Sequence, residues 1–538
     1  MEFHKSPADA DADCDDEASA KLMVNHQHVD PVNPSSGRST PIHNSFTEVE
    51  VVRLEDRVTL EAHNMEHLVE AYRKKRSSVL QGEKARDFDF ECRVEATPIE
   101  IQVDSILHKL RKEDEKMFEE EKPRKGNGGQ EHPRFAGDHY LSNVDLIQKS
   151  NLFRVARHLP KGSHLHIHFN ACLPPRFLLD IAAGMDRMFI TGNVPLTPEN
   201  LDRCQIEFSI KSKDDENDEP APINMFPSDH KGRWCMKFGT FLTLSENHFD
   251  GLKPMDWVVK KVEFQEEEAY GPLQTAAGAW KLFNGRTKLM KGLFNYEKAF
   301  RKYVGAFLQN LVDDKILYAE IRPTFMESNY LFSDDGTGKK NNAEIMDIII
   351  EEVDKFKAGL SDKNMFHHIR VIYCTPRSMN EEQMEAGLNE CIRFKERWPE
   401  MIAGFDVVGE EGPVNHVEHP LKKFTLQFLV FRETCKRKDL DIPFLFHCGE
   451  TLDMGTSTDG NLIDALLLGA KRIGHGFALP KHPYIMQLMK EAGVCVEVCP
   501  ISNEILGLTP RAASHAMYAL LANNVHCTVN SDNGTLFR

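Results

Sequence analysis

Short apolar runs, each ending in polar residues, recur along the chain and constrain its fold more than any other feature. Runs of this length are typical of buried parallel strands that open into loops. Helical patterns separate them, for instance at 343–357, 381–398, 421–437 and 484–492. The eight runs are 161–168, 316–322, 369–374, 402–409, 443–450, 472–476, 494–500 and 525–532. Strands that alternate with helices eight times predict an α/β fold, a (β/α)8 TIM-type barrel.

Chemistry is expected at the C-terminal ends of these strands, where barrel enzymes place their active sites. In the run 443–450, four apolar or aromatic residues precede His447, and Glu450 follows three residues later. A doubly wound open sheet is the alternative fold, but no glycine-rich phosphate loop follows the first run. The sequence therefore places His447 and Glu450 at the catalytic rim of a barrel.

Three histidines alternate with apolar residues in the first run. A strand would place His164, His166 and His168 on one face. They could form the polar face of an exposed strand, but neutral imidazoles two residues apart also suit a zinc-like ion. The second interpretation gains weight from the polar residues at the ends of other strands.

Together the strand ends predict a metal site with one zinc ion per chain. Its ligands would be His166, His168, His447 and Asp532, because imidazole and carboxylate suit zinc. Such an ion lowers the pKa of water from about 15.7 to near 7. Glu450 is offset from the ligands and can transfer protons. His475, between two glycines, can reach the same water.

The chain is expected to contain three parts. Residues 1–55 are polar, acidic and turn-rich, which predicts a disordered tail. Residues 56–150 carry helical patterns at 60–76, 99–121 and 144–157, and predict an N-terminal helical segment that packs on the next domain or serves as a dimerisation arm. The barrel would occupy 151–538, with an acidic insertion subdomain at about 189–251 after the first strand.

Composition excludes several partners and locations. The net charge of −17 over 538 residues argues against nucleic acid and anionic membranes as partners. No run approaches the length of a membrane-spanning helix, and the first thirty residues lack the apolar core of a signal peptide. We therefore expect a cytoplasmic protein with free thiols, although Cys204 and Cys235 could be bridged in an oxidising compartment.

Several motifs, taken in order, resemble the adenosine deaminase family, most closely its adenosine deaminase-related growth factor branch. They are Pro160-Lys-Gly, Leu165-His-Ile-His168, Phe446-His-Cys-Gly-Glu-Thr451, Arg472-Ile-Gly-His-Gly-Phe-Ala-Leu479, Val496-Glu-Val-Cys-Pro-Ile-Ser-Asn503 and Ser531-Asp532. That branch also carries an N-terminal helical dimerisation segment and an insertion after the first strand. The resemblance implies a homodimer through the N-terminal helices.

The resemblance also implies a reaction, the hydrolysis of adenosine or 2'-deoxyadenosine to inosine and ammonia. The four metal ligands predicted above would keep that role. Glu450 would protonate N1 of the purine while hydroxide, oriented by His475 and Asp532, attacks C6. Gly409 would contact the purine through its backbone. The other zinc deaminase class, with His-x-Glu and Pro-Cys-x-x-Cys, matches only its first half at His416-Val-Glu418.

The chain departs from the family pattern in three places. Asn533 stands where the family has an aspartate that contacts purine N7, and Phe169-Asn170 replaces the usual aspartate that contacts the ribose. The chain also stops at Arg538, so we expect the helix that closes the barrel after the eighth strand to be missing. Two alternatives stay open: a deaminase of another purine nucleoside or nucleotide, with Arg322 as a candidate phosphate contact, and a catalytically inactive interaction protein.

Overall fold

The computed structural model describes residues 62–126, 128–211, 226, 232–326, 329–412 and 418–537. The chain divides into two units, Met1–Lys84 and Ala85–Arg538, and helix α2 (Ala62–Lys84) represents the first. The tail predicted over 1–55 lies outside the described residues. The boundary between the units falls inside the segment 56–150, which the sequence analysis treated as one part.

Eight parallel strands in the described residues form the barrel, and the (β/α)8 prediction is confirmed. They make two four-stranded sheets, in the orders β11-β10-β7-β3 and β12-β13-β14-β15. Parallel bridges from Phe405 to Phe444 and from Ile167 to Asp532 join the two sheets into a ring. The strands are β3 (Gly162–His168), β7 (Ile316–Arg322), β10 (His368–Pro376), β11 (Ile402–Val408), β12 (Leu445–Cys448), β13 (Arg472–His475), β14 (Cys495–Val498) and β15 (Cys527–Val529).

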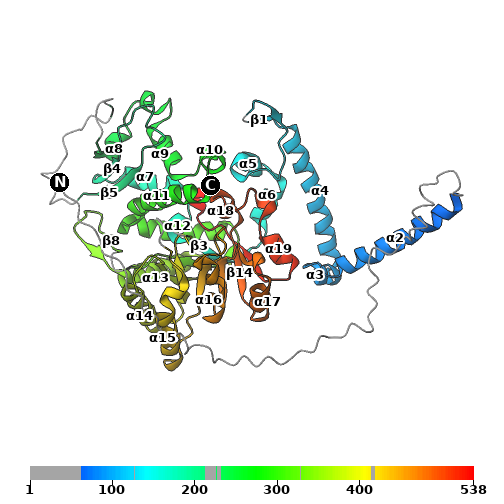
Figure 1. Ribbon diagram of the computed structural model, residues 1–538. Helices are drawn as coiled ribbons and strands as arrows, with labels where there is room; N and C mark the ends of the chain where they lie inside the picture. The colour runs from blue at the N-terminus through cyan, green and yellow to red at the C-terminus, as the bar shows by residue number, and fades with distance from the viewer. Residues whose placement is uncertain are drawn as a thin grey trace, which may run out of the picture. The chain divides into compact units, whose positions relative to one another are not determined.

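Helices follow the strands along the chain and cover the outside of the barrel (Figure 1). Asn341 and Asn380 begin the first two of them with capping boxes, in which the asparagine and the third helical residue bond each other's backbone N–H groups. These helices are α13 (Asn342–Gly359), α14 (Glu381–Arg397), α15 (Thr425–Arg437), α16 (Asn461–Leu467), α17 (Pro483–Glu491), α18 (Pro500–Ile505) and α19 (Met517–Ala522).

The segment before the barrel forms helices α3 (Phe90–Glu95) and α4 (Pro98–Glu120) and the short strands β1 (Arg124–Lys125) and β2 (Glu131–His132). The single helix predicted at 144–157 is wrong, because two helices occupy this stretch. They are α5 (Tyr140–Ile147) and α6 (Asn151–His158). Ser150 starts α6 as its N-cap by accepting a bond from the backbone N–H of Phe153.

The insertion after the first barrel strand builds a small antiparallel sheet in the order β5-β4-β6. Residues 212–225 and 227–231 of the insertion lie outside the described residues. Cys204 and Cys235 are both free thiols. The strands are β4 (Met188–Gly192), β5 (Ile206–Ile210) and β6 (Trp234–Lys237). The remaining elements are α7 (Pro175–Ala183), α8 (Phe238–Phe241), α9 (Pro254–Val262), α10 (Glu266–Tyr270), α11 (Ala276–Phe294), α12 (Glu297–Asp313), β8 (Leu331–Phe332) and β9 (Lys339–Lys340).

After β15 the described chain forms one short helix, α20 (Gly534–Phe537). The carbonyl of Leu536 accepts a hydrogen bond from the backbone N–H of Phe264, and the Phe537 ring packs near Phe264. Val529 on β15 is 73% exposed. No helix within the described ranges is both long enough and apolar enough to span a membrane.

Candidate metal and active site

Four predicted ligands converge at the C-terminal ends of the barrel strands. Nε2 of His168 lies 3.1 Å from Nε2 of His447, although β3 and β12 are far apart in sequence. Oδ1 of Asp532, just after β15, lies 3.3 Å from Nε2 of His168 and 3.7 Å from Nε2 of His166. The structure therefore brings His166, His168, His447 and Asp532 together, and their role as ligands stays a prediction.

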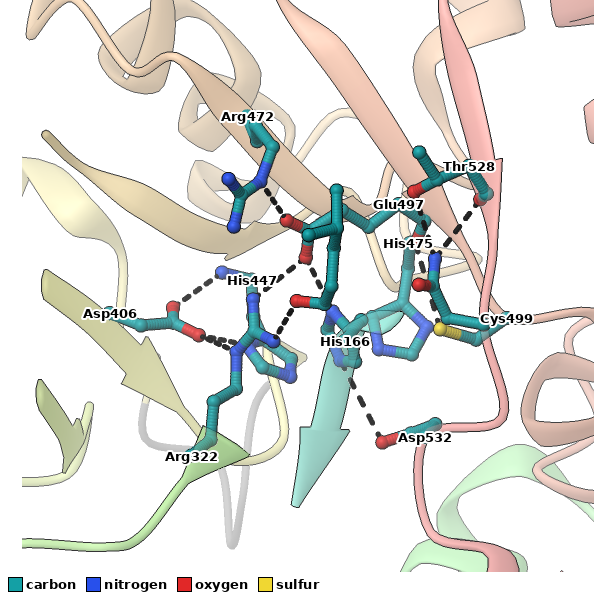
Figure 2. A network of polar contacts seen from close by, with 12 residues as sticks. His166, Arg322, Asp406, His447, Arg472, His475, Glu497, Cys499, Thr528 and Asp532 are labelled. Atoms are coloured by element: carbon teal, nitrogen blue, oxygen red, sulfur yellow. Dashed lines mark hydrogen bonds and ion pairs between the residues drawn. The ribbon is translucent and has the colours of Figure 1, made fainter. Parts of the chain in front are cut away.

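The outward-facing nitrogens of two of the predicted ligand histidines are held by buried carboxylates (Figure 2). Nδ1 of His166 lies 2.8 Å from Glu497, and Nδ1 of His447 lies 2.7 Å from Asp406. A carboxylate accepts the Nδ1–H, so the lone pair of Nε2 points into the cluster. Nε2 of His166 is buried and has no hydrogen-bond partner in the described part of the chain. An inward-facing orphan acceptor beside two imidazoles and a carboxylate fits a divalent metal ion.

Buried ion pairs support these carboxylates. Arg322 donates from Nε to Asp406 at 2.9 Å and from Nη2 to Glu497 at 2.7 Å. Arg472 donates to Glu497 and to Glu320. Burial alone would raise the pKa of Asp406, but His447 and the Arg322 guanidinium hold that pKa well below its usual range. Ion pairs with arginine therefore fix the carboxylates that hold the rings of His166 and His447.

Burial keeps three histidines at the site neutral. Removal from water lowers the pKa of His166, His168 and His475 well below the ordinary value, and neighbouring positive groups lower it further. A neutral imidazole is the form that binds metal. Cys499 also lies among these groups, but burial raises its pKa well above the ordinary value, so it stays a thiol and is a poor ligand.

Glu450 and His475 form a second pair beside the cluster. Oε1 of Glu450 lies 3.2 Å from Nδ1 of His475, and both side chains are buried. Burial raises the pKa of Glu450 well above its ordinary value, and the nearby charges of Asp532 and Glu411 raise it further. A raised pKa favours the protonated form of the Glu450 carboxyl, which is the form that can act as an acid.

Two residues of the site have a strained backbone. His475 and Asp532 have φ of 64° and 58°, a left-handed conformation that is unusual for residues other than glycine. Between β12 and β14, Gly474 permits a close approach, because a Cβ built there would meet Cε1 of His166 at 2.8 Å. The fold thus accepts local strain in order to aim these side chains.

The predicted substrate residues lie at the same rim. Gly409 follows β11 with φ of 106°. Asn533 is buried and donates from Nδ2 to Oδ1 of Asp532 at 2.7 Å. Asn170 follows β3 in a short 3-10 turn and lines a cavity. Phe169 instead packs in the core against Phe294 and other rings. The roles of Gly409, Asn170 and Asn533 in substrate binding stay predictions.

Some sequence expectations need correction or extension. Arg322 was a candidate phosphate contact, but its guanidinium is buried and paired with Asp406 and Glu497, so it is not a free cation at the rim. The sequence analysis did not find Asp406 or Glu497 as supporting residues. A charged residue between apolar residues of a buried strand was the available signal. His164 contacts Ser531 outside the ligand cluster, and His416 lies outside the described residues.

The chain is similar in sequence to known adenosine deaminases. The sequence model of the family described as "Adenosine deaminase" matches residues 263–538. An adenosine deaminase of Aedes albopictus is 27% identical over 402 residues, covering 74% of this chain and 67% of that protein. Human adenosine deaminase 2 is 28% identical over 408 residues, covering 74% and 71%. A solved Arabidopsis N6-mAMP deaminase aligns with a TM-score of 0.46 at 15% identity, covering 71% and 85%.

Proposed function

Because this chain belongs to the adenosine deaminase family, and so is a hydrolase that acts on a C–N bond of a cyclic amidine, we propose that it deaminates adenosine or 2'-deoxyadenosine with one zinc ion. One observation carries the proposal. His166, His168, His447 and Asp532 converge beside Glu450, a buried carboxyl whose pKa is raised well above its ordinary value by burial. The cytoplasmic location expected from the sequence stays a prediction.

The ion would be held by His166, His168, His447 and Asp532. When bound, a zinc ion lowers the pKa of water to about 7 and so makes a nucleophile available at neutral pH. The surrounding protein prepares this set before any ion arrives, because Glu497 and Asp406 fix which nitrogen of His166 and His447 faces inward.

Glu450 would supply the proton that the purine ring needs. Donation from its carboxyl to N1 makes C6 more electron-poor, so oxygen adds there and a C–O bond forms. The C6–N bond then breaks as the proton of the added hydroxyl is transferred to the amino group, so ammonia leaves and inosine retains the proton on N1. His475 lies within 3.2 Å of Glu450 and would orient the attacking oxygen. Glu411 accepts a bond from the backbone N–H of Glu450 at 2.7 Å and so holds its loop in place.

Ammonia release from adenosine by the zinc-loaded protein tests the proposal. Glu450→Gln keeps the shape of the side chain but removes the transferable proton, so we expect zinc near one equivalent and a loss of about 10²–10⁴-fold in kcat. Glu385→Gln, an exposed change on α14, is the matched control. Zinc binding without release of ammonia from adenosine, 2'-deoxyadenosine or AMP would favour the inactive interaction protein instead.

A purine nucleoside 5'-monophosphate is the second candidate substrate, and a cavity of about 290 Å³ favours it. This cavity opens where β3 and β7 end, and Asn170 contributes to its wall. Lys288 and Lys291 on α11 also line it. Lys288 is paired with Glu207 at 2.6 Å, whereas Lys291 has no ion pair with any residue that the structure describes. An unmatched cation beside the predicted ribose contact would suit a phosphate group.

Parallel assays with adenosine and AMP separate the two substrates. If the phosphate lies against Lys291, Lys291→Met raises KM for AMP about tenfold, equal to 1.4 kcal/mol, and leaves adenosine kinetics unchanged. Lys281→Met, an exposed change on the same helix, is the control. Equal effects of the two substitutions would exclude Lys291 as a phosphate contact.

A further inference from the structure

The side-chain amide of Asn503, on α18, joins two buried histidines. Its Nδ2 lies 3.1 Å from Nδ1 of His475, and its Oδ1 lies 2.8 Å from Nε2 of His515. Nδ1 of His515 accepts a hydrogen bond from the backbone N–H of Met517 at 3.0 Å. Asn503, His475 and His515 are all buried. A continuous hydrogen-bonded chain therefore runs from the Met517 backbone to His475, next to the metal cluster.

The backbone of Met517 fixes the direction of every bond in this chain, because an amide N–H can only donate. Nδ1 of His515 must accept, so His515 is neutral and carries its proton on Nε2. Burial acts in the same direction and lowers the pKa of His515 to about 4. The Nε2–H of His515 then donates to the oxygen of Asn503, which assigns the other amide atom as the NH₂ group. That group donates to Nδ1 of His475.

We propose that Asn503 and His515 are positioning residues that hold His475 in its Nε2–H tautomer. With Nδ1 occupied as an acceptor, the ring proton of neutral His475 is on Nε2. This inference rests on the proposed deaminase function for its catalytic meaning. In that reaction His475 donates a hydrogen bond to the attacking oxygen and stabilises its charge, and it does not remove a proton.

The same tautomer excludes His475 from the ligand set. A ring nitrogen of His475 lies within 4.8 Å of ligand atoms on His166, Asp532 and Cys499, so proximity alone does not exclude it as a ligand. An Nε2 that carries a proton has no lone pair for a cation, and Nδ1 already accepts from Asn503. Of the histidines in the cluster, His166, His168 and His447 then remain as nitrogen ligands.

A hydrogen bond from His475 to Glu450 would require the opposite tautomer of His475. Its Oε1 lies 3.2 Å from the same Nδ1, and an ionised Glu450 would accept a bond from an Nδ1–H tautomer. Nδ1 has one lone pair, so it cannot accept from Asn503 and also carry a proton for Glu450. Under the proposal, Glu450 keeps its own proton, and its 3.2 Å contact with Nδ1 is not a hydrogen bond. The two arrangements differ in which nitrogen of His475 carries the proton.

Nitrogen NMR of histidine-labelled, metal-free protein distinguishes these arrangements without any turnover. Signals of His475 are identified by their loss in His475→Gln. We expect an acceptor-type ¹⁵N shift at Nδ1 and an N–H-type shift at Nε2. The reverse pattern, or a doubly protonated ring, would overturn the proposal.

Asn503→Asp tests the chain directly, because aspartate has the same shape but only accepts. His515 can still donate to one oxygen, and the other oxygen then requires an Nδ1–H on His475. We expect the NMR pattern of His475 to reverse and kcat to fall about 10²–10⁴-fold, with little change in KM. Asn523→Asp, exposed at the C-cap of α19, adds the same charge and should change neither. An unchanged tautomer in Asn503→Asp contradicts the proposal.

His515→Phe provides a second test should Asn503→Asp fail to fold. It removes the donor that orients the amide, so both tautomers of His475 should appear and kcat should fall less than in Asn503→Asp. A single Nε2–H pattern in His515→Phe would show that His515 has no positioning role. Failure of the deaminase proposal is distinguishable, because it would leave the Nε2–H pattern intact in a protein that releases no ammonia.

Discussion

Glu497→Gln removes one charge from the centre of the buried network and keeps the shape of the side chain. Oε2 of Glu497 accepts from Nδ1 of His166 at 2.8 Å and from Nη2 of Arg322 at 2.7 Å, while Oε1 accepts from Arg472. Glutamine has one acceptor oxygen. If that oxygen stays with His166 and Arg322, the amide NH₂ faces Arg472, and two donors meet without an acceptor.

The size of the effect follows from what each arginine retains. Removal of one partner from a buried ion pair costs about 3–5 kcal/mol. Arg322 keeps Asp406 and Arg472 keeps Glu320, so we expect the lower end, about 3 kcal/mol. Globular proteins typically have about 5–15 kcal/mol of stability, so the variant should fold. Loss of the carboxylate behind His166 should weaken metal binding about 10–100-fold.

Two measurements on the same variant test this reasoning. Urea unfolding of the metal-free protein gives the change in stability, and competition with a chelator gives the metal Kd. Glu320→Gln is the matched control, because Glu320 bonds Arg472 and Tyr318 but contacts none of the described ligand histidines. We expect it to lower stability and leave the metal Kd unchanged. Equal metal affinity in Glu497→Gln and wild type, or equal weakening by both variants, would refute the reasoning.

Three further outcomes are expected. Gly474→Ala brings a Cβ to 2.8 Å from His166, so chelator competition should show about tenfold weaker metal binding. In metal-free protein the raised pKa of Glu450 means that the folded state keeps a proton that the unfolded chain loses above about pH 4.3. The free energy of unfolding should therefore fall by about 1.4 kcal/mol per pH unit up to that raised pKa. Urea titrations of Glu450→Gln should lack this pH-dependent fall. We also propose a homodimer through the N-terminal helices, where Ile101 and Ile106 of α4 are 60% and 51% exposed; Ile101→Glu should then yield monomers by sedimentation, and a monomeric wild type would contradict it.

Local patterns were enough to predict the barrel and the residues at its rim. Each strand is a short apolar run, and His447 and Asp532 follow directly from where such runs end. The helix predicted at 144–157 failed because apolar spacing continues across Ser150, while the capping bond of that serine starts a new helix. Spacing reports which face of an element is buried, and it says little about where one helix gives way to the next.

The supporting network could not be predicted in the same way. Arg322, Asp406 and Glu497 lie on β7, β11 and β14, and they meet only when the ring of strands closes. A lone charged residue in an apolar strand indicates that a buried partner exists, but it does not identify that partner. The directions of the hydrogen bonds around His475 are even harder to predict from the sequence, because they depend on the backbone N–H of Met517.

Charge balance around the site connects the network to the metal. Arg377 adds a further guanidinium, which donates to the backbone carbonyl of His447 at 2.9 Å. Among the described residues, and apart from Glu450, we count in this network three guanidinium groups and five carboxylates, with Asp532 taken as ionised: Arg322, Arg377, Arg472, Glu320, Asp406, Glu411, Glu497 and Asp532. Two negative charges are left unmatched in a buried region, where an uncompensated charge is costly. One divalent cation cancels them, but only if Glu450 stays protonated. The network therefore couples metal binding to the protonation of Glu450. A bound divalent ion makes the region neutral only while Glu450 keeps the proton that it would donate to the substrate.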